Sequence, residues 1–173
     1  MITEAEKRGD LKPDMTVVEA TGGSTGSSLA FICAVKGYNF HVVSSDVFAA
    51  EKIKTMRAFG TDVDLVHVPG GKITKELFPE MMRRASAKVE SDLSMHYYTN
   101  QSKNSDALPG YESLGLELVE QFPGGIDVFC GAAGSAGMLM GVASVLKEKR
   151  ESCRVGACFF ACCYAGLDGH PWG

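Results

Sequence analysis

The chain has 173 residues, of which 45% are hydrophobic and 22% are charged, a composition typical of a soluble globular protein with a buried core. Its 17 basic and 21 acidic side chains give a net charge of −4, which argues against a nucleic-acid partner because such binding needs a basic face. The longest apolar window, residues 126–146, contains Asp127 and several glycines, and the first eight residues are charged. We therefore predict no membrane span and no signal peptide, and expect a cytoplasmic protein.

Short β-rich runs alternate with helical patterns along the chain. The runs predict strands at residues 16–19, 40–43, 63–68, 126–130 and 154–160. The patterns between them predict helices at residues 27–35, 48–59, 77–89, 111–121 and 138–149. This alternation indicates an α/β fold of parallel βαβ units, with helices on both faces of the sheet. Residues 95–108 are polar and lack periodicity, so we interpret them as a functional loop or a crossing between lobes.

The six cysteines give no metal-binding pattern. Cys33 and Cys130 lie in apolar runs and are expected to be small buried side chains. The other four lie close together but lack paired C-x-x-C spacing, and His170 is a poor fourth ligand, so no zinc site is predicted; these are Cys153, Cys158, Cys162 and Cys163. Without a secretory signal the thiols are expected to be reduced.

The remaining histidines show no partner at a motif spacing. His41, His67 and His96 each stand apart from any carboxylate or hydroxyl that would complete a known pattern. A catalytic triad is therefore not predicted.

Two glycine loops each follow a predicted strand and precede a predicted helix. The first spans residues 21–26 and contributes hydroxyls from Thr21, Ser24 and Thr25; the second spans residues 131–137 and contributes Ser135. Helix N-termini carry N–H groups without an intrahelical partner, and glycines let the backbone approach a ligand. Such loops can hold a carboxylate or a phosphate, although each could also be a tight turn without a ligand.

Neither loop matches a nucleotide-binding motif. The chain has no G-x-x-x-x-G-K-[ST], and the second loop spaces its glycines G-x-x-G-x-x-G instead of G-x-G-x-x-G. A nucleotide-binding Rossmann protein is therefore the weaker alternative.

Four segments resemble, in order, motifs of the cysteine synthase and cystathionine β-synthase family, which are fold-type II enzymes that use pyridoxal 5′-phosphate. Residues 18–30 resemble the family's substrate loop, E-P-T-S-G-N-T-G-x-x-L-A, and residues 127–142 resemble its phosphate loop, D-x-F-V-x-G-x-G-T-G-G-T-L-x-G-V. Residues 51–60 are similar to E-K-x-x-x-[LM]-x-x-x-G, and residues 101–107 to Q-F-x-N-x-x-N. The resemblance implies doubly wound parallel sheets in two lobes, the tryptophan synthase β-like architecture.

The resemblance also implies roles for individual residues. The substrate's α-carboxylate would be bound by Thr21, Gly22, Ser24, Thr25 and, from across the cleft, Gln101. The cofactor would be bound by Ser24, Gly134, Ser135, Ala136, Gly137 and Met138, the last five through amides around its phosphate. The implied reaction is β-replacement or β-elimination on an O-activated serine or similar amino acid, with the pyridine ring as electron sink. The full-length family implies a homodimer.

Several positions depart from the family pattern, among them Ser102, which replaces a phenylalanine. Ser24 replaces an Asn expected to bond the cofactor's ring hydroxyl, and Met138 replaces a Thr whose hydroxyl would reach the phosphate. Ala136 replaces a glycine, which requires either a negative φ there or a small strain. These changes predict a divergent branch with altered substrate choice.

The family's Schiff-base lysine stands in an N-P-x-x-S-x-K-x-R context, upstream of the segment where this chain begins, and none of the chain's lysines has that context. No catalytic residue is therefore assigned, because the covalent amine and the base at Cα would both be missing. We expect an internal piece of such an enzyme: a smaller substrate-loop lobe at residues 13–100, part of the larger cofactor lobe at 101–160, and an aberrant tail at 161–173. The alternative is a non-catalytic module that binds an anion, the cofactor or a partner.

Overall fold

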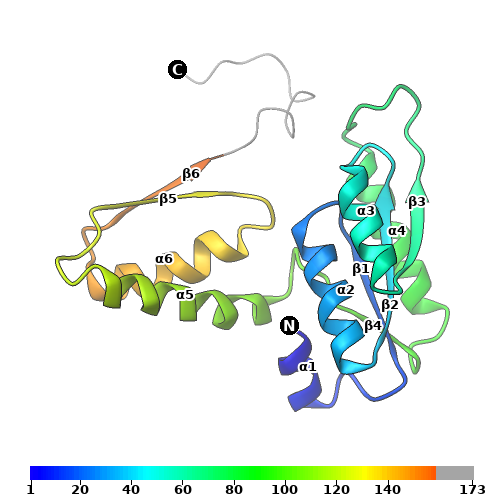
Figure 1. The fold of residues 1–173 in the computed structure, drawn as a ribbon, viewed down its shortest axis with the longest axis horizontal. Coiled ribbons are helices and arrows are strands. Elements are labelled where there is room, and N and C mark those ends of the chain that lie inside the picture. The colour runs from blue at the N-terminus through cyan, green and yellow to red at the C-terminus, as the bar shows by residue number, and fades with distance from the viewer. Residues whose placement is uncertain (159–173) are drawn as a thin grey trace. The chain divides into compact units, whose positions relative to one another are not determined.

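The computed structural model describes residues 1–158 (Figure 1). Residues 159–160 of the last predicted strand and the predicted tail at 161–173, with Cys162, Cys163 and His170, lie outside the described residues. The described residues divide into two compact units: one is Ile2–Asn100 and the other begins at Gln101. Each unit is described by itself.

The first unit is a four-stranded parallel sheet with helices on both faces. Its elements in chain order are α1 (Ile2–Arg8), β1 (Thr16–Ala20), α2 (Ser24–Lys36), β2 (Asn39–Ser45), α3 (Ala50–Ala58), β3 (Asp62–Val66), α4 (Leu77–Glu90) and β4 (His96–Tyr98). The strand order β3-β2-β1-β4 reverses after β3, because α4 carries the chain back to the opposite edge. Right-handed crossovers therefore place α2 and α3 on one face and α4 on the other.

The central strands are rich in valine because both of their faces are covered. Val17, Val18, Val42 and Val43 are fully buried. On the α4 side, the strand residues pack with Leu77, Met81 and Ala85 into one hydrophobic cluster. This core holds the carboxyl ends of β1 and β2 in fixed positions.

The second unit joins two helices to a two-stranded parallel sheet. Its elements are a 3₁₀ turn η1 (Ser105–Ala107), α5 (Leu108–Gln121), β5 (Val128–Ala132), α6 (Gly137–Lys149) and β6 (Arg154–Cys158). Figure 1 shows α5 and α6 lying along each other beneath the β5–β6 pair. A Cβ at Gly141 would lie 2.6 Å from Tyr111 Cβ, and one at Gly115 would lie 2.8 Å from Val145 Cβ, so these glycines let the two helices approach closely.

The predicted α/β alternation is confirmed, with element ends shifted by a few residues. Residues 95–108, predicted to be a functional loop or a crossing between lobes, contain two regular elements that were not predicted: β4, which pairs in parallel with β1, and η1. β4 has only three residues, all half-buried, so it offers no alternation to detect. The charged residues at the start of the chain form the short helix α1.

The two cysteines predicted to be buried differ. Cys33 is 1% exposed, and desolvation raises the pKa of its thiol to about 12. Cys130 is exposed, which corrects the prediction. Along β5 only Gly131 is buried and Phe129 is half-buried, so one face of the β5–β6 pair packs on the helices while Cys130 lies on the other.

Within residues 1–158, no helix combines the length and the apolar composition needed to cross a bilayer. The same residues contain no cluster of three His, Cys, Asp or Glu side chains that could hold a metal ion.

Candidate functional site

The first glycine loop joins β1 to α2 at the carboxyl edge of the parallel sheet. Thr21 N–H donates to Val43 O at 3.0 Å, so the loop leaves from a backbone position that is still tied to β2. α2 then begins at Ser24, with Gly23 as its N-cap. Ligands in open α/β sheets bind at this edge, outside the carboxyl ends of the strands.

Two glycines in this loop are required by packing. A Cβ at Gly22 would lie 2.1 Å from Phe48 Cδ2, and a Cβ at Gly26 would lie 2.7 Å from Met56 Sδ. Phe48 itself packs against Phe78 with ring centroids 5.9 Å apart. The path of the backbone between β1 and α2 is therefore set by side chains from the β2–α3 connection and from α3.

The polar groups of the first loop have different surroundings. Thr21 is 5% exposed, and its hydroxyl accepts from Gly23 N–H at 3.3 Å, so it shapes the loop. Ser24 is exposed and Thr25 is half-buried. No acceptor within residues 1–158 bonds the backbone N–H of Gly22 or Ser24, which leaves these donors available to an anion.

A further hydroxyl at this end of α2 was not predicted. Ser27 Oγ is buried and has no hydrogen-bond partner in the described part of the chain. Its position in the first turn of α2 places a polar group beside the unsatisfied N–H groups of the helix. The sequence signal was present, a serine one turn into a glycine-rich helix start, but it does not differ from an ordinary surface serine.

The second loop joins β5 to α6 in the other unit. Ala133 N–H donates to Cys158 O at 3.0 Å, and Met140 N–H donates to Ala136 O at 2.9 Å as the first helical bond. Between these two bonds, no residue of the described chain accepts a hydrogen bond from the N–H groups of Gly134 to Gly137. Gly134 and Ser135 are exposed, and a Cβ at Gly134 would meet no atom within 4 Å.

Ala136 has left-handed backbone geometry, with φ 63° and ψ −2°. The sequence predicted either a negative φ or a small strain at this position, and the structure shows the strain. An alanine with a positive φ is disfavoured because its Cβ contacts the backbone. A left-handed residue in a turn is the backbone arrangement that forms anion-binding concavities from successive N–H groups.

Met138 serves the packing of the second unit. Its Cε would lie 3.0 Å from a Cβ at Gly131, so the side chain lies back over β5. It is half-buried beside the cluster of Val142, Leu146 and Cys153. Only the backbone N–H of Met138 is therefore available to the loop.

Gln101, the remaining predicted substrate residue, is half-buried at the start of the second unit.

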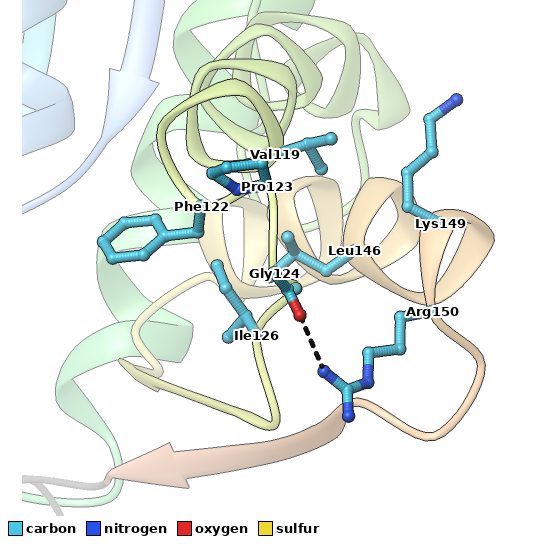
Figure 2. A pocket seen from close by; sticks show the side chains of 9 residues that line it. Val119, Phe122, Pro123, Gly124, Ile126, Leu146, Lys149 and Arg150 are labelled. Carbon is cyan, nitrogen blue, oxygen red and sulfur yellow. Dashed lines mark hydrogen bonds between the residues drawn. The ribbon is translucent and has the colours of Figure 1, made fainter.

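A pocket in the second unit lies at the opposite end of the β5–α6 unit from the glycine loop. Its volume is about 370 Å³, and Figure 2 shows Phe122, Ile126 and Leu146 lining it beside Arg150. Arg150 donates to Gly124 O at 3.4 Å and pairs with Asp127 at 2.7 Å. Because the pocket lies where β5 begins, it is away from the edge at which such sheets bind ligands.

Two histidines thought to be isolated have carboxylate partners in the first unit. His41 Nδ1 lies 2.7 Å from Asp62 Oδ2, and His67 Nδ1 bonds Asp46, whose pKa it lowers. The first pair arises because the parallel register sets His41 opposite Asp62, which spacing along the chain does not reveal. The nearby Ser45 hydroxyl donates to Val66 O at 2.6 Å, so this group does not have the geometry of a triad.

Comparison with known proteins identifies the family. The model of the pyridoxal-phosphate dependent enzyme family matches residues 1–170. The chain is 33% identical to cystathionine beta-synthase of Mus musculus, over 90% of this chain and 27% of that protein. It is 35% identical to cysteine synthase B of Pseudomonas aeruginosa, over 90% of this chain and 50% of that protein.

Comparison of the fold with solved structures leads to the same family. A hydrogen sulfide-producing enzyme from Fusobacterium nucleatum superimposes with a TM-score of 0.79 and 31% identity, covering 90% of this chain and 50% of that one. The chain therefore spans between about a quarter and a half of the length of these relatives. Its architecture is that of the fold-type II enzymes, as the sequence resemblance implied. The chain belongs to the family of pyridoxal-phosphate dependent enzymes.

Proposed function

We propose that this chain carries two binding elements of a cysteine synthase-like enzyme: a loop for the carboxylate of an amino acid and a loop for the phosphate of pyridoxal 5′-phosphate. The reaction would be β-replacement or β-elimination on an O-activated serine or a similar small amino acid. The observation that carries the proposal is the β5–α6 loop, where the N–H groups from Gly134 to Gly137 have no acceptor within residues 1–158. The family match and the relatives named cysteine synthase support it.

The residues of the β5–α6 loop fit a phosphate group. Gly134 leaves open space above the loop, and the exposed Ser135 can add its hydroxyl to the amides. The start of α6 contributes a partial positive charge, because its peptide dipoles are aligned and its first N–H groups are unsatisfied. The cofactor would be held by Gly134, Ser135, Ala136, Gly137 and, through its N–H alone, Met138.

The β1–α2 loop has the groups to bind a carboxylate. Free backbone donors at Gly22 and Ser24 would bond the anion, and the hydroxyls of Ser24 and Thr25 would fix its orientation. Thr21 would hold the loop in shape while it binds, and Gln101 would add a side-chain amide. When bound, the cofactor supplies an electron sink for the substrate's Cα.

The hydroxyl of Ser24 would also replace the amide that the family pattern places near the cofactor. A serine side chain is shorter than asparagine and reaches less far from the start of α2. We therefore propose that this position alters the choice of substrate. No lysine of this chain has the N-P-x-x-S-x-K-x-R context, so no residue is assigned to covalent attachment.

We also propose the lobe boundaries and the setting of the protein. Residues 13–100 would form the smaller substrate-loop lobe and residues 101–160 part of the larger cofactor lobe, supported by the division at Asn100. A homodimer in the cytoplasm would be the working form, supported by the resemblance to the family. The partner molecules would be small amino acids.

Phosphorus NMR of pyridoxal 5′-phosphate titrated with the chain tests the proposal. The phosphate resonance should shift and broaden with the unsubstituted chain. Gly134→Asp, which places a negative charge on the open side of the loop, should weaken binding at least about tenfold. Gly124→Asp is the matched control, because Gly124 is also a glycine in open space, at the other end of the unit. A resonance unaffected by the unsubstituted chain, or equal loss in both variants, would contradict the proposal.

A further inference from the structure

A buried carboxylate lies directly before the β1–α2 loop. Glu19, the fourth residue of β1, is 1% exposed although its neighbours in the sheet are valines. Burying an ionisable group costs free energy unless hydrogen bonds compensate for the lost water. The contacts of Glu19 therefore indicate what the group does at this position.

The ladder between β1 and β4 ends at Val18, two residues before the end of β1. The last paired residues are Val18 and Tyr98, and Thr99 N–H then donates to Val18 O at 3.1 Å. Thr21 N–H donates toward β2, to Val43 O. Because backbone groups alternate in direction along a parallel strand, Ala20 N–H faces the β4 side, beyond the last paired residue.

Glu19 bridges the two strand ends at this point. Its Oε1 accepts from Ala20 N–H at 2.8 Å, and its Oε2 lies 2.7 Å from Thr99 Oγ1, which is also 3.1 Å from Val18 O. Thr99 is fully buried. Ala20 stands where the motif quoted above has proline, and a proline could not donate the first of these bonds. The bridge in this form thus depends on the chain's own alanine.

We infer that Glu19 is a positioning residue for the amino-acid loop. By bonding Ala20 and Thr99 with one side chain, it fixes the direction in which residues 21–25 leave the sheet. It thereby fixes the direction in which the N–H groups of Gly22 and Ser24 point. The effect on ligand affinity rests on the proposed function of that loop. The effect on loop mobility does not.

Substitutions can remove the bridge while keeping its volume. Thr99→Val removes the hydroxyl and Glu19→Met removes both acceptors. Thr99→Ser keeps the hydroxyl. Glu19→Gln keeps an acceptor for Ala20 N–H and offers a donor to Thr99 Oγ1, whose proton then goes to Val18 O. Thr61→Val is the matched control, because Thr61 is also buried and its Oγ1 has no partner within residues 1–158.

The experiment measures amide hydrogen exchange and L-serine binding by NMR on the full chain. Thr99→Val and Glu19→Met should speed exchange at Ala20 and Gly23, and weaken L-serine binding, by about fivefold, the effect of one lost hydrogen bond. Exchange at Val42 in the core should change less than twofold. Thr99→Ser, Glu19→Gln and Thr61→Val should all match the unsubstituted chain.

Each outcome decides the inference. Faster loop exchange in Thr99→Val than in Thr61→Val supports it, and equal exchange in the two overturns it. If an apolar variant does not fold, Glu19→Gln decides instead. Fivefold faster amide exchange in the loop of that variant would overturn the inference, because it would show that the loop depends on the charge of Glu19 and not on its bridging hydrogen bonds. Failure of the unsubstituted chain to bind L-serine contradicts the proposed function, while the exchange rates still establish or reject the role of Glu19.

Discussion

The two glycine loops differ both in backbone geometry and in what surrounds them: the residue before α2 is extended, whereas the residue before α6 is left-handed. The β1–α2 loop is held by packing: Gly22 lies under Phe48, Gly26 lies under Met56, and the strands behind it are buried on both faces. The β5–α6 loop is open, with Gly134 and Ser135 exposed and with its turn made by an alanine in left-handed geometry. Side chains from distant parts of the chain therefore constrain the first loop along its length, whereas the middle of the second loop, at Gly134 and Ser135, is open.

The largest expected change in stability comes from substitutions in the cores behind the two loops. Met81→Ala should lower the free energy of unfolding of the first unit by about 3 kcal/mol, because Met81 is fully buried in the cluster beneath the sheet. Met138→Ala should cost about 1 kcal/mol, because that side chain is only half-buried. Urea denaturation followed by circular dichroism measures both values. Equal costs would show that the second unit is as tightly packed as the first.

A smaller effect is expected from adding one methyl group to each loop. Gly22→Ala should cost about 2 kcal/mol, because its Cβ overlaps the Phe48 ring and would force that ring away from Phe78. Gly134→Ala should change stability by less than about 0.5 kcal/mol, because its Cβ meets no atom. Thermal melts of the two variants provide the comparison. A neutral Gly22→Ala would mean that Phe48 does not determine the path of the first loop.

The smallest effect concerns pH and the surface of the first unit. Arg83 and Arg84 lower the pKa of Glu80 from 4.5 to about 2. A carboxyl group whose pKa is lower in the folded than in the unfolded chain stabilises the fold at pH values above about 4.5. This stability is lost as the pH falls from about 4.5 toward 2. The melting temperature of Glu80→Gln should therefore change less with pH in that range than the melting temperature of the unsubstituted chain.

Glu112→Gln is the control for this measurement, since Glu112 is an exposed helical glutamate of the second unit that makes no ion pair with residues 1–158. Its melting temperature should follow the unsubstituted chain throughout the window. Parallel curves for Glu80→Gln and the unsubstituted chain would show that solvent screens the Arg83 and Arg84 pairs completely.

Much of the fold could be predicted from the sequence because buried parallel strands and amphipathic helices carry different periodicities. β4 could not, since three half-buried residues have no period, and it forms only because β1 offers it an edge. The exposure of Cys130 was missed because an apolar run does not reveal whether one or both faces of its strand are covered.

The candidate site shows the same division. The positions of both glycine loops followed from spacing, because each loop lies between a strand and a helix. The contacts that shape the first loop could not be predicted: Phe48 over Gly22 and Thr99 beside Glu19 join residues that are distant in sequence. The partners of His41 and His67 were missed for the same reason, since strand register decides them.

The left-handed alanine at position 136 has an evolutionary consequence. Every alanine codon becomes a glycine codon by a change of its middle base, so relief of the unfavourable φ is one nucleotide away. Random mutagenesis with selection for heat resistance should therefore recover glycine at this position early, because glycine adopts this φ without a steric cost.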